Sequence, residues 1–370
     1  VAAALAVGGV IGSQNLKIGD LDKGAPELRQ DSRYNKDNAF VVDNYSTSSD
    51  VLVIMAETPA EKCATFEALD AMDRLMWEME NVPGVQSTVS LVSVTKLMGK
   101  AYNEGNPKWS ALSRNQNILN SSVQRAPAGM LNQTCSMAPV IIFLNDHKAE
   151  TLENAVKAAE EFAKGYENNE NIQFKLASGN AGVEAATNEV IAKAQNLMLV
   201  FVYIVVSVLC FITFRSFRAV LCIITPLALT SILCQALMAQ MGIGVKVATL
   251  PVIALGVGIG VDYGIYIYSR LEALLIEGLS LHDAFFKTLK TTGKAVSFTG
   301  LTLAIGVGTW IFSPIKFQAD MGILLTFMFI WNMVGSLILL PALSRFILKP
   351  ESIIAKHKAR HGDVSPAETL

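Results

Sequence analysis

Hydrophobic residues are distributed unevenly along the chain. Residues 13–195 mix short apolar and polar stretches, as a folded polar domain does, whereas residues 196–348 consist mainly of long apolar runs. An apolar run of about 20 residues has the length of a helix that crosses the hydrocarbon core of a bilayer. The pattern therefore predicts a polar α+β domain over 13–195, a membrane domain over 196–348 and a charged tail over 349–370.

The membrane domain is expected to contain five spanning helices. Between the third and fourth, residues 271–290 place leucines at helical spacing opposite charged side chains, which favours an interfacial helix broken near Gly278. Residues 1–12 are apolar but too short to cross a bilayer, so we interpret them as the end of another transmembrane helix. The five predicted spans are about 197–214, 219–241, 247–268, 295–312 and 321–345.

Basic residues concentrate on one side of the predicted bundle. Most lysines and arginines of the membrane domain follow the first, third and fifth spans, whereas the alternate loops hold only Lys246, Lys316 and the acidic Asp320. Because lysine- and arginine-rich loops stay in the cytoplasm, the interfacial helix and the tail 349–370 are expected there. Residues 13–195 are then expected on the opposite face, which in a bacterium is the periplasmic side of the inner membrane.

The polar domain shows two β-α-β patterns, which predict a ferredoxin-like sheet. In the first, Thr58-Pro59-Ala60-Glu61 has the pattern of a capped helix start. Residues 92–134 fit neither pattern and are expected to form a helical or loop insertion. The predicted elements are strand 51–57, a helix from Thr58 to about residue 80, strand 85–91, strand 139–144, helix 151–166 and strand 172–177.

Cys63 and Cys135 are the only cysteines outside the predicted spans. Cys63 follows the first strand and Cys135 precedes the third, and these strands are antiparallel neighbours in a ferredoxin-like sheet. The two positions therefore meet at one edge, and an oxidising periplasm permits a disulfide between them.

Asp262 is the only charged residue in the third predicted span, 247–268. A charge inside a span costs roughly 2.5–3.5 kcal/mol on insertion scales, so it rarely occurs without a partner or a function. On a helix, Tyr266 lies about 40° and Tyr263 about 100° around from Asp262, which places the three polar side chains on one arc. A carboxyl group removed from water holds its proton more readily, as a proton relay requires. A structural hydrogen-bond anchor between helices is the alternative interpretation.

Glycines recur every fourth residue beside this arc, at Gly256, Gly260 and Gly264. Small residues at this spacing allow another helix to approach closely, so we interpret them as a packing face. The segment is not interpreted as a nucleotide-binding loop, because no strand precedes it and no Lys-Ser/Thr pair follows.

The sequence Leu255-Gly-Val-Gly-Ile-Gly-Val-Asp-Tyr-Gly-Ile-Tyr266, followed by Arg270, resembles the relay helix of the RND superfamily, most closely that of MmpL-like exporters. Thr213-Phe-Arg-Ser-Phe-Arg218 is similar to the first cytoplasmic turn of that family, and the segment from Asn81 to Leu91 to its periplasmic strand motif. RND drug pumps that use paired aspartates and a lysine differ from this pattern.

The resemblance implies that each half of the transporter has one helix, a porter-type periplasmic domain and five further helices. The chain would then be the C-terminal half, and Asp262 and Tyr263 would face an equivalent pair in the first half. Export of a hydrophobic or lipid-like substrate, driven by protons through Asp262, Tyr263 and Tyr266, is the implied function. Two alternatives are a lipid-binding regulator of the sterol-sensing type and a protein-translocation accessory of the SecDF type.

The expected partners follow from this assignment. They are membrane lipids, the N-terminal half of the same transporter or a second subunit, further copies of the chain in a dimer or trimer, and a periplasmic or outer-membrane protein.

Composition argues against several other classes. The chain has 370 residues, 51% hydrophobic and 17% charged, whereas a soluble domain has about a quarter charged residues. A net charge of −2 gives no reason to expect a nucleic-acid partner. The five cysteines form no C-x-x-C pair and the four histidines are scattered, with His357 and His361 in the basic tail, so neither a metal site nor a cofactor is expected. The polar domain shows no catalytic triad pattern, and no enzyme activity is expected.

Overall fold

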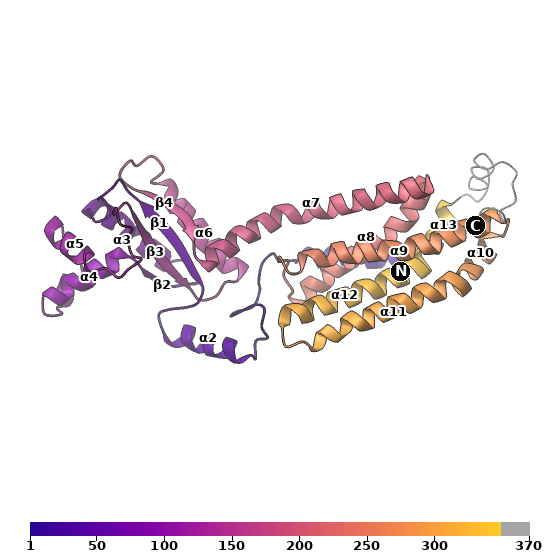
Figure 1. Cartoon of the computed structure of the whole chain (residues 1–370), viewed down its shortest axis with the longest axis horizontal. Helices are drawn as coiled ribbons and strands as arrows, with labels where there is room; N and C mark the ends of the chain where they lie inside the picture. The colour runs from indigo at the N-terminus through magenta and orange to yellow at the C-terminus, as the bar shows by residue number, and fades with distance from the viewer. Residues whose placement is uncertain (349–370) are drawn as a thin grey trace. The chain divides into compact units, whose positions relative to one another are not determined.

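The computed structural model describes residues 1–348 and divides into two compact units (Figure 1). One unit is Gly19–Val190, and the other combines Val1–Ile18 with the chain from Ile191 onward. The predicted tail 349–370, with His357 and His361, lies outside the described residues.

The unit Gly19–Val190 is built on a four-stranded sheet with the order β2-β3-β1-β4, in which every neighbouring pair is antiparallel. Burial alternates along β1 and β3, so one face of the sheet is covered. A period of two is expected for a sheet that packs on one side only. The strands are β1 (Val51–Glu57), β2 (Val85–Val89), β3 (Met137–Leu144) and β4 (Gln173–Ser178).

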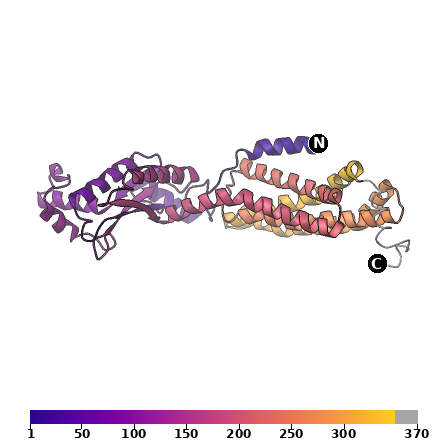
Figure 2. The same ribbon diagram turned by 90° about the horizontal axis from the view of Figure 1, so that it is seen from above.

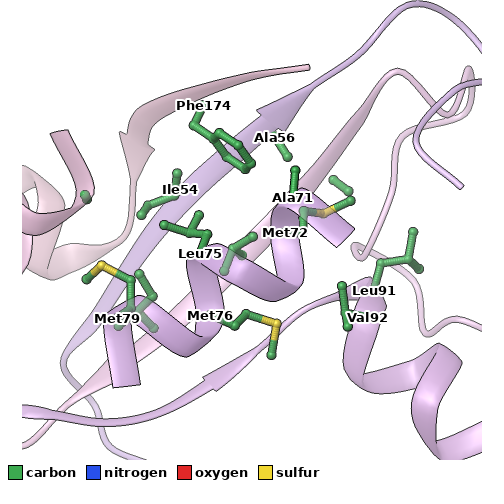
Figure 3. Close-up of a cluster of buried hydrophobic side chains, with 14 of the residues drawn as sticks. Ile54, Ala56, Ala71, Met72, Leu75, Met76, Met79, Leu91, Val92 and Phe174 are labelled. Atoms are coloured by element: carbon green, nitrogen blue, oxygen red, sulfur yellow. The ribbon is translucent and has the colours of Figure 1, made fainter. Parts of the chain in front are cut away.

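Helices of the same unit supply the rest of its core. Leu69, Met72, Leu75 and Met79, spaced three or four residues apart on α3, are all fully buried in the core of this unit. Figure 3 shows the last three of them beside the sheet. This spacing places them on one face of the helix. The helices are α2 (Arg33–Asn44), α3 (Phe66–Glu80), α4 (Leu91–Tyr102), η1 (Pro107–Trp109), α5 (Gln116–Val123) and α6 (Ala149–Lys164).

Helix α3 begins later than its sequence pattern predicts. The start expected at Thr58-Pro59 is wrong, because α3 begins at Phe66 and Thr65 is its N-cap. The intervening segment pairs instead with the chain before β3: the backbone N–H of Glu61 donates to the carbonyl of Thr134 (2.8 Å), and that of Cys63 to the carbonyl of Cys135 (3.0 Å). Residues 92–134 form the helical insertion that was expected, with η1 and α5 and most of α4 inside it.

Within residues 1–348, five helical segments are long and apolar enough to cross a membrane, the number predicted. The short apolar helix α1 (Ala2–Ser13) lies along α8 (Figure 2). Helices α8, α9 and α12 contact one another, and α11 packs on α12. The segments are α7 (Asn180–Phe214), α8 (Phe217–Met241), α9 (Leu250–Ile276), α10 with η2, α11 and η3 (Leu281–Thr288, Leu289–Gly293, Lys294–Gly308, Thr309–Phe312), and α12 with η4 and α13 (Lys316–Val334, Gly335–Leu339, Leu340–Ile347).

Residues 271–290 are divided between two helices, and the break expected near Gly278 is present. Helix α9 continues to Ile276, and the chain turns at Gly278, whose φ of +91° is the left-handed conformation that favours glycine. Ser280 then caps α10, accepting from the N–H of Asp283 (3.2 Å), and α10 continues through the π-helical η2 into α11. Leu271, Leu274 and Leu275 are buried in the helix bundle. Their helical spacing therefore marks the buried face of α9.

Candidate functional site

Asp262 lies on α9, the helix that packs against both α8 and α12. The glycine face predicted from the sequence is directed at these two neighbours. A Cβ added to Gly264 would lie 2.9 Å from Cγ2 of Ile223 on α8, and one added to Gly256 would lie 3.0 Å from Cβ of Met328 on α12. A Cβ on Gly260 would meet both helices, with Cδ2 of Leu227 at 2.8 Å. The glycines therefore allow the close approach of α9 to its neighbours.

A buried asparagine joins α12 to this glycine face. Asn332 is 2% exposed, and its Nδ2 donates to the carbonyl oxygen of Gly256 (2.8 Å). Its Oδ1 has no hydrogen-bond partner among the described residues. This residue was not singled out from the sequence, although an asparagine within the apolar run of the fifth span was a visible signal.

The opposite side of α9 is exposed. Five residues spaced three or four apart lie there, and Tyr266 has 59% of its surface accessible. This spacing puts them on one face of the helix. We call this face the α9 stripe: Leu255, Gly258, Asp262, Tyr266 and Ser269.

The structure separates the three predicted relay residues. Asp262 and Tyr266 share the α9 stripe, but Tyr263 is 2% exposed and points into the bundle. The hydroxyl of Tyr263 has no hydrogen-bond partner in the described part of the chain. Because successive helical residues are about 100° apart, the residue after an exposed Asp262 turns toward the packed side.

Cys63 and Cys135 are joined by a disulfide, with their Cα atoms 5.2 Å apart. The bond ties the segment before α3 to the segment before β3. Cys210, Cys222 and Cys234 are free and buried in the helix bundle.

A second polar cluster lies in the unit Gly19–Val190, where no functional residue had been expected. It brings together Asp20, Asp50, His147 and Glu184. These residues are far apart in the sequence and follow no spacing motif, so only the fold could bring them together.

A bundle of apolar helices with one carboxylate on an exposed helical face defines the chain as a multi-span membrane protein. The model of the MMPL family matches residues 34–361. The chain belongs to the MMPL family, an RND-like family, as the resemblance of the α9 sequence implied.

Several curated proteins are similar to parts of the chain. The putative membrane protein MJ1562 of Methanocaldococcus jannaschii is 24% identical over 51% of this chain and 48% of its own length. The membrane protein YdfJ of Bacillus subtilis is 27% identical over 24% of this chain and 12% of its own length. The probable trehalose monomycolate exporter MmpL3 of Mycobacterium leprae is 31% identical over 29% of this chain and 11% of its own length. The matched part is thus less than half of each of these relatives.

Proposed function

We propose that the chain forms part of an exporter that moves a hydrophobic or lipid-like substrate, driven by the proton-motive force. Membership of the MMPL family, whose members are transporters, supports the general class. The similarity to a protein named as a probable trehalose monomycolate exporter supports the lipid-like character of the substrate.

The position of Asp262 is the observation that carries the proposal. It is the only charged residue of 247–268, and it lies on the exposed α9 stripe rather than in the packed interior. A carboxylate facing lipid is costly, so this stripe is expected to be covered by protein. We propose that a matching helix from another half or subunit of the transporter covers it and places a second carboxyl group opposite Asp262.

The tight packing of α9 offers a route from protonation to movement. With glycines directed at α8 and α12, α9 packs closely on side chains of both helices, so we propose that a shift of α9 is passed on to them. A proton that binds Asp262 neutralises the carboxylate. Because the charge is lost, α9 changes its position against the covering helix. Tyr266, on the same stripe, would contact the covering helix. Tyr263 would instead change its contacts inside the bundle when α9 moves.

We further propose that Gly19–Val190 is a ferredoxin-like, porter-type domain on the non-cytoplasmic side of the membrane, the periplasmic side of a bacterial inner membrane. Three observations support this. The strand order and the two β-α-β connections fit that fold. The disulfide fits an oxidising compartment. The basic residues within 215–218 and 287–294 fit the opposite, cytoplasmic side.

Replacement of the carboxyl group tests the relay. In the protein as it occurs in the cell, Asp262→Asn is expected to abolish substrate export that depends on the proton gradient, while the amount of membrane-inserted protein stays unchanged. Asp37→Asn is the matched control, because Asp37 is an exposed carboxylate on α2 that forms a surface ion pair with Arg33. Export that survives Asp262→Asn would remove the relay and favour the lipid-binding regulator. Loss of protein secretion with intact lipid export would favour the SecDF-type accessory.

A further inference from the structure

Four ionisable side chains converge at one end of the sheet in the unit Gly19–Val190. Asp50 directly precedes β1, and His147 follows β3, whose last residues pair with the start of β1. Asp20 follows the turn at Gly19, and Glu184 lies near the start of α7. The cluster therefore unites four segments that are distant in the sequence.

The imidazole of His147 is the centre of this cluster. His147 is 3% exposed, and its Nδ1 lies 3.1 Å from Oδ1 of Asp50. Its other ring nitrogen, Nε2, is buried and has no hydrogen-bond partner among the described residues. A buried polar atom without a partner is costly, and such atoms in a folded protein call for an explanation.

Two carboxyl groups lie next to the imidazole. A ring nitrogen of His147 and carboxylate oxygens of Asp20 and Glu184 all lie within 4.8 Å of one another.

The segment with Asp20 is held in place by its backbone. The carbonyl oxygen of Asp20 accepts from the N–H of Ala149 at the start of α6 (3.1 Å). Gly19 has a φ of +84°, and a Cβ there would lie 2.6 Å from Nδ2 of Asn188, one turn beyond Glu184 on α7. Glycine thus allows this segment to approach α7 closely, which brings Asp20 to Glu184.

We propose that His147, Asp20 and Glu184 bind a divalent transition-metal ion, for which Zn²⁺ fits the donors best. Asp50 would hold the imidazole through Nδ1 and leave Nε2 for the ion, an arrangement common for histidine ligands. One imidazole and two carboxylates suit Zn²⁺, with bonds of about 2.0–2.2 Å. Such bonds bring ligand atoms to about 3.4 Å from one another in a tetrahedron, so small rotations of the carboxylates close the site. A water would take the fourth position, and the ion would link α7 to the β3–α6 loop.

Zinc binding by the purified full chain tests the site. After removal of metals with a chelator, the chain is titrated with Zn²⁺ in competition with a chromophoric chelator. About one Zn²⁺ per chain is expected, and Glu184→Gln and His147→Gln are each expected to weaken binding by about 10-fold or more. Asp50→Asn is expected to weaken it by about 10–100-fold as a positioning effect. His282→Ala is the matched control, because His282 is an exposed histidine outside the cluster.

Cobalt substitution in the unaltered chain keeps the proposal testable if a variant fails to fold. X-ray absorption of the Co²⁺ form is expected to show one imidazole and oxygen ligands. The proposal would be overturned if the unaltered chain bound no Zn²⁺, or if Glu184→Gln bound Zn²⁺ as tightly as the unaltered chain. It would also be overturned if the Co²⁺ ligands included sulfur and no imidazole. These measurements do not involve transport, so their outcome is independent of the role of Asp262.

Discussion

The amide of Asn332 on α12 donates a hydrogen bond of 2.8 Å to the carbonyl oxygen of Gly256 on α9. The bond is buried and lies on the packed side of the helix that carries Asp262. It ties α9 to α12 where the missing side chain of Gly260, one turn further along α9, leaves room for the asparagine.

Asn332→Ala is expected to destabilise the helix bundle by about 1 kcal/mol, because interhelical hydrogen bonds in membrane proteins contribute about 0.6–1.7 kcal/mol. Thermal unfolding of the detergent-purified chain measures the loss. Asn196→Ala, at an exposed position of α7, should leave the unfolding temperature unchanged. Equal stability of the Asn332→Ala and Asn196→Ala variants would contradict a contribution of this bond.

Gly260→Ala is expected to destabilise the bundle by about 1–3 kcal/mol, because its Cβ would overlap Leu227 and Asn332 on two neighbouring helices. Gly306→Ala on α11 is the control, since a Cβ there meets nothing within 4 Å. The control is expected to be neutral or more stable by about 0.5–1 kcal/mol, as alanine favours a helix. The difference between the two unfolding free energies is the quantity to compare, and a value near zero would show that the close approach is not needed.

Tyr263→Phe and Tyr266→Phe separate folding from function. The Tyr263 hydroxyl is buried without a partner among the described residues, so its removal should leave the unfolding free energy unchanged or raise it slightly. Any loss of export by Tyr263→Phe would then reflect a role in the relay. Unfolding free energy and export are measured on both variants and compared. A marked loss of stability in Tyr263→Phe would indicate that its hydroxyl is hydrogen-bonded in the assembled protein.

Loss of the disulfide should destabilise the unit Gly19–Val190. The cysteines are separated by 72 residues, and closure of a loop of this size contributes about 4 kcal/mol in the chain-entropy model. Unfolding of a Cys63→Ser/Cys135→Ser double variant in urea measures it. In the denatured, unreduced natural chain, maleimide should label only the three cysteines at 210, 222 and 234. Labelling at Cys63 or Cys135 without reductant would contradict the bond.

Labelling from outside intact cells tests the orientation. Asp37→Cys on α2 and His282→Cys on α10 replace exposed side chains in the two units. A membrane-impermeant maleimide should label position 37 in intact cells and position 282 only after lysis. The reverse pattern would invert the proposed orientation.

The parts of the fold that depend on a repeating pattern were predictable from the sequence. The strands β1 and β3 were expected from the β-branched run at Val51–Glu57 and from the apolar Pro139–Leu144, whereas their alternating burial is seen only in the structure. The five long apolar runs predicted the five candidate spans, since the helix is the local way to pair a backbone away from water.

Features decided by distant contacts were harder to predict. Thr58-Pro59 has a good local helix start, but the pairing of Glu61 and Cys63 with the chain before β3 removes that segment from α3. Residues 271–290 are divided between two helices for a related reason, because the first leucines of this segment continue the buried face of α9.

The candidate relay was predicted in part. Asp262 stood out as a lone charge, and the spacing of Tyr266 placed it on the same face. The inward direction of Tyr263 depends on which side of α9 packs against α8 and α12, and the sequence of α9 alone does not determine that side. The cluster around His147 had no sequence signal, because its members come from four separate segments.

The α9 stripe also bears on how the cell handles the protein during its synthesis. An uncovered carboxylate in an apolar helix is unfavourable in lipid, and it becomes tolerable only when another helix shields it. A copy that fails to find its covering helix therefore differs from an assembled one at a single exposed face. We expect membrane proteases and insertion factors to act on that difference, so Asp262 would limit the lifetime of unassembled copies as well as serve transport.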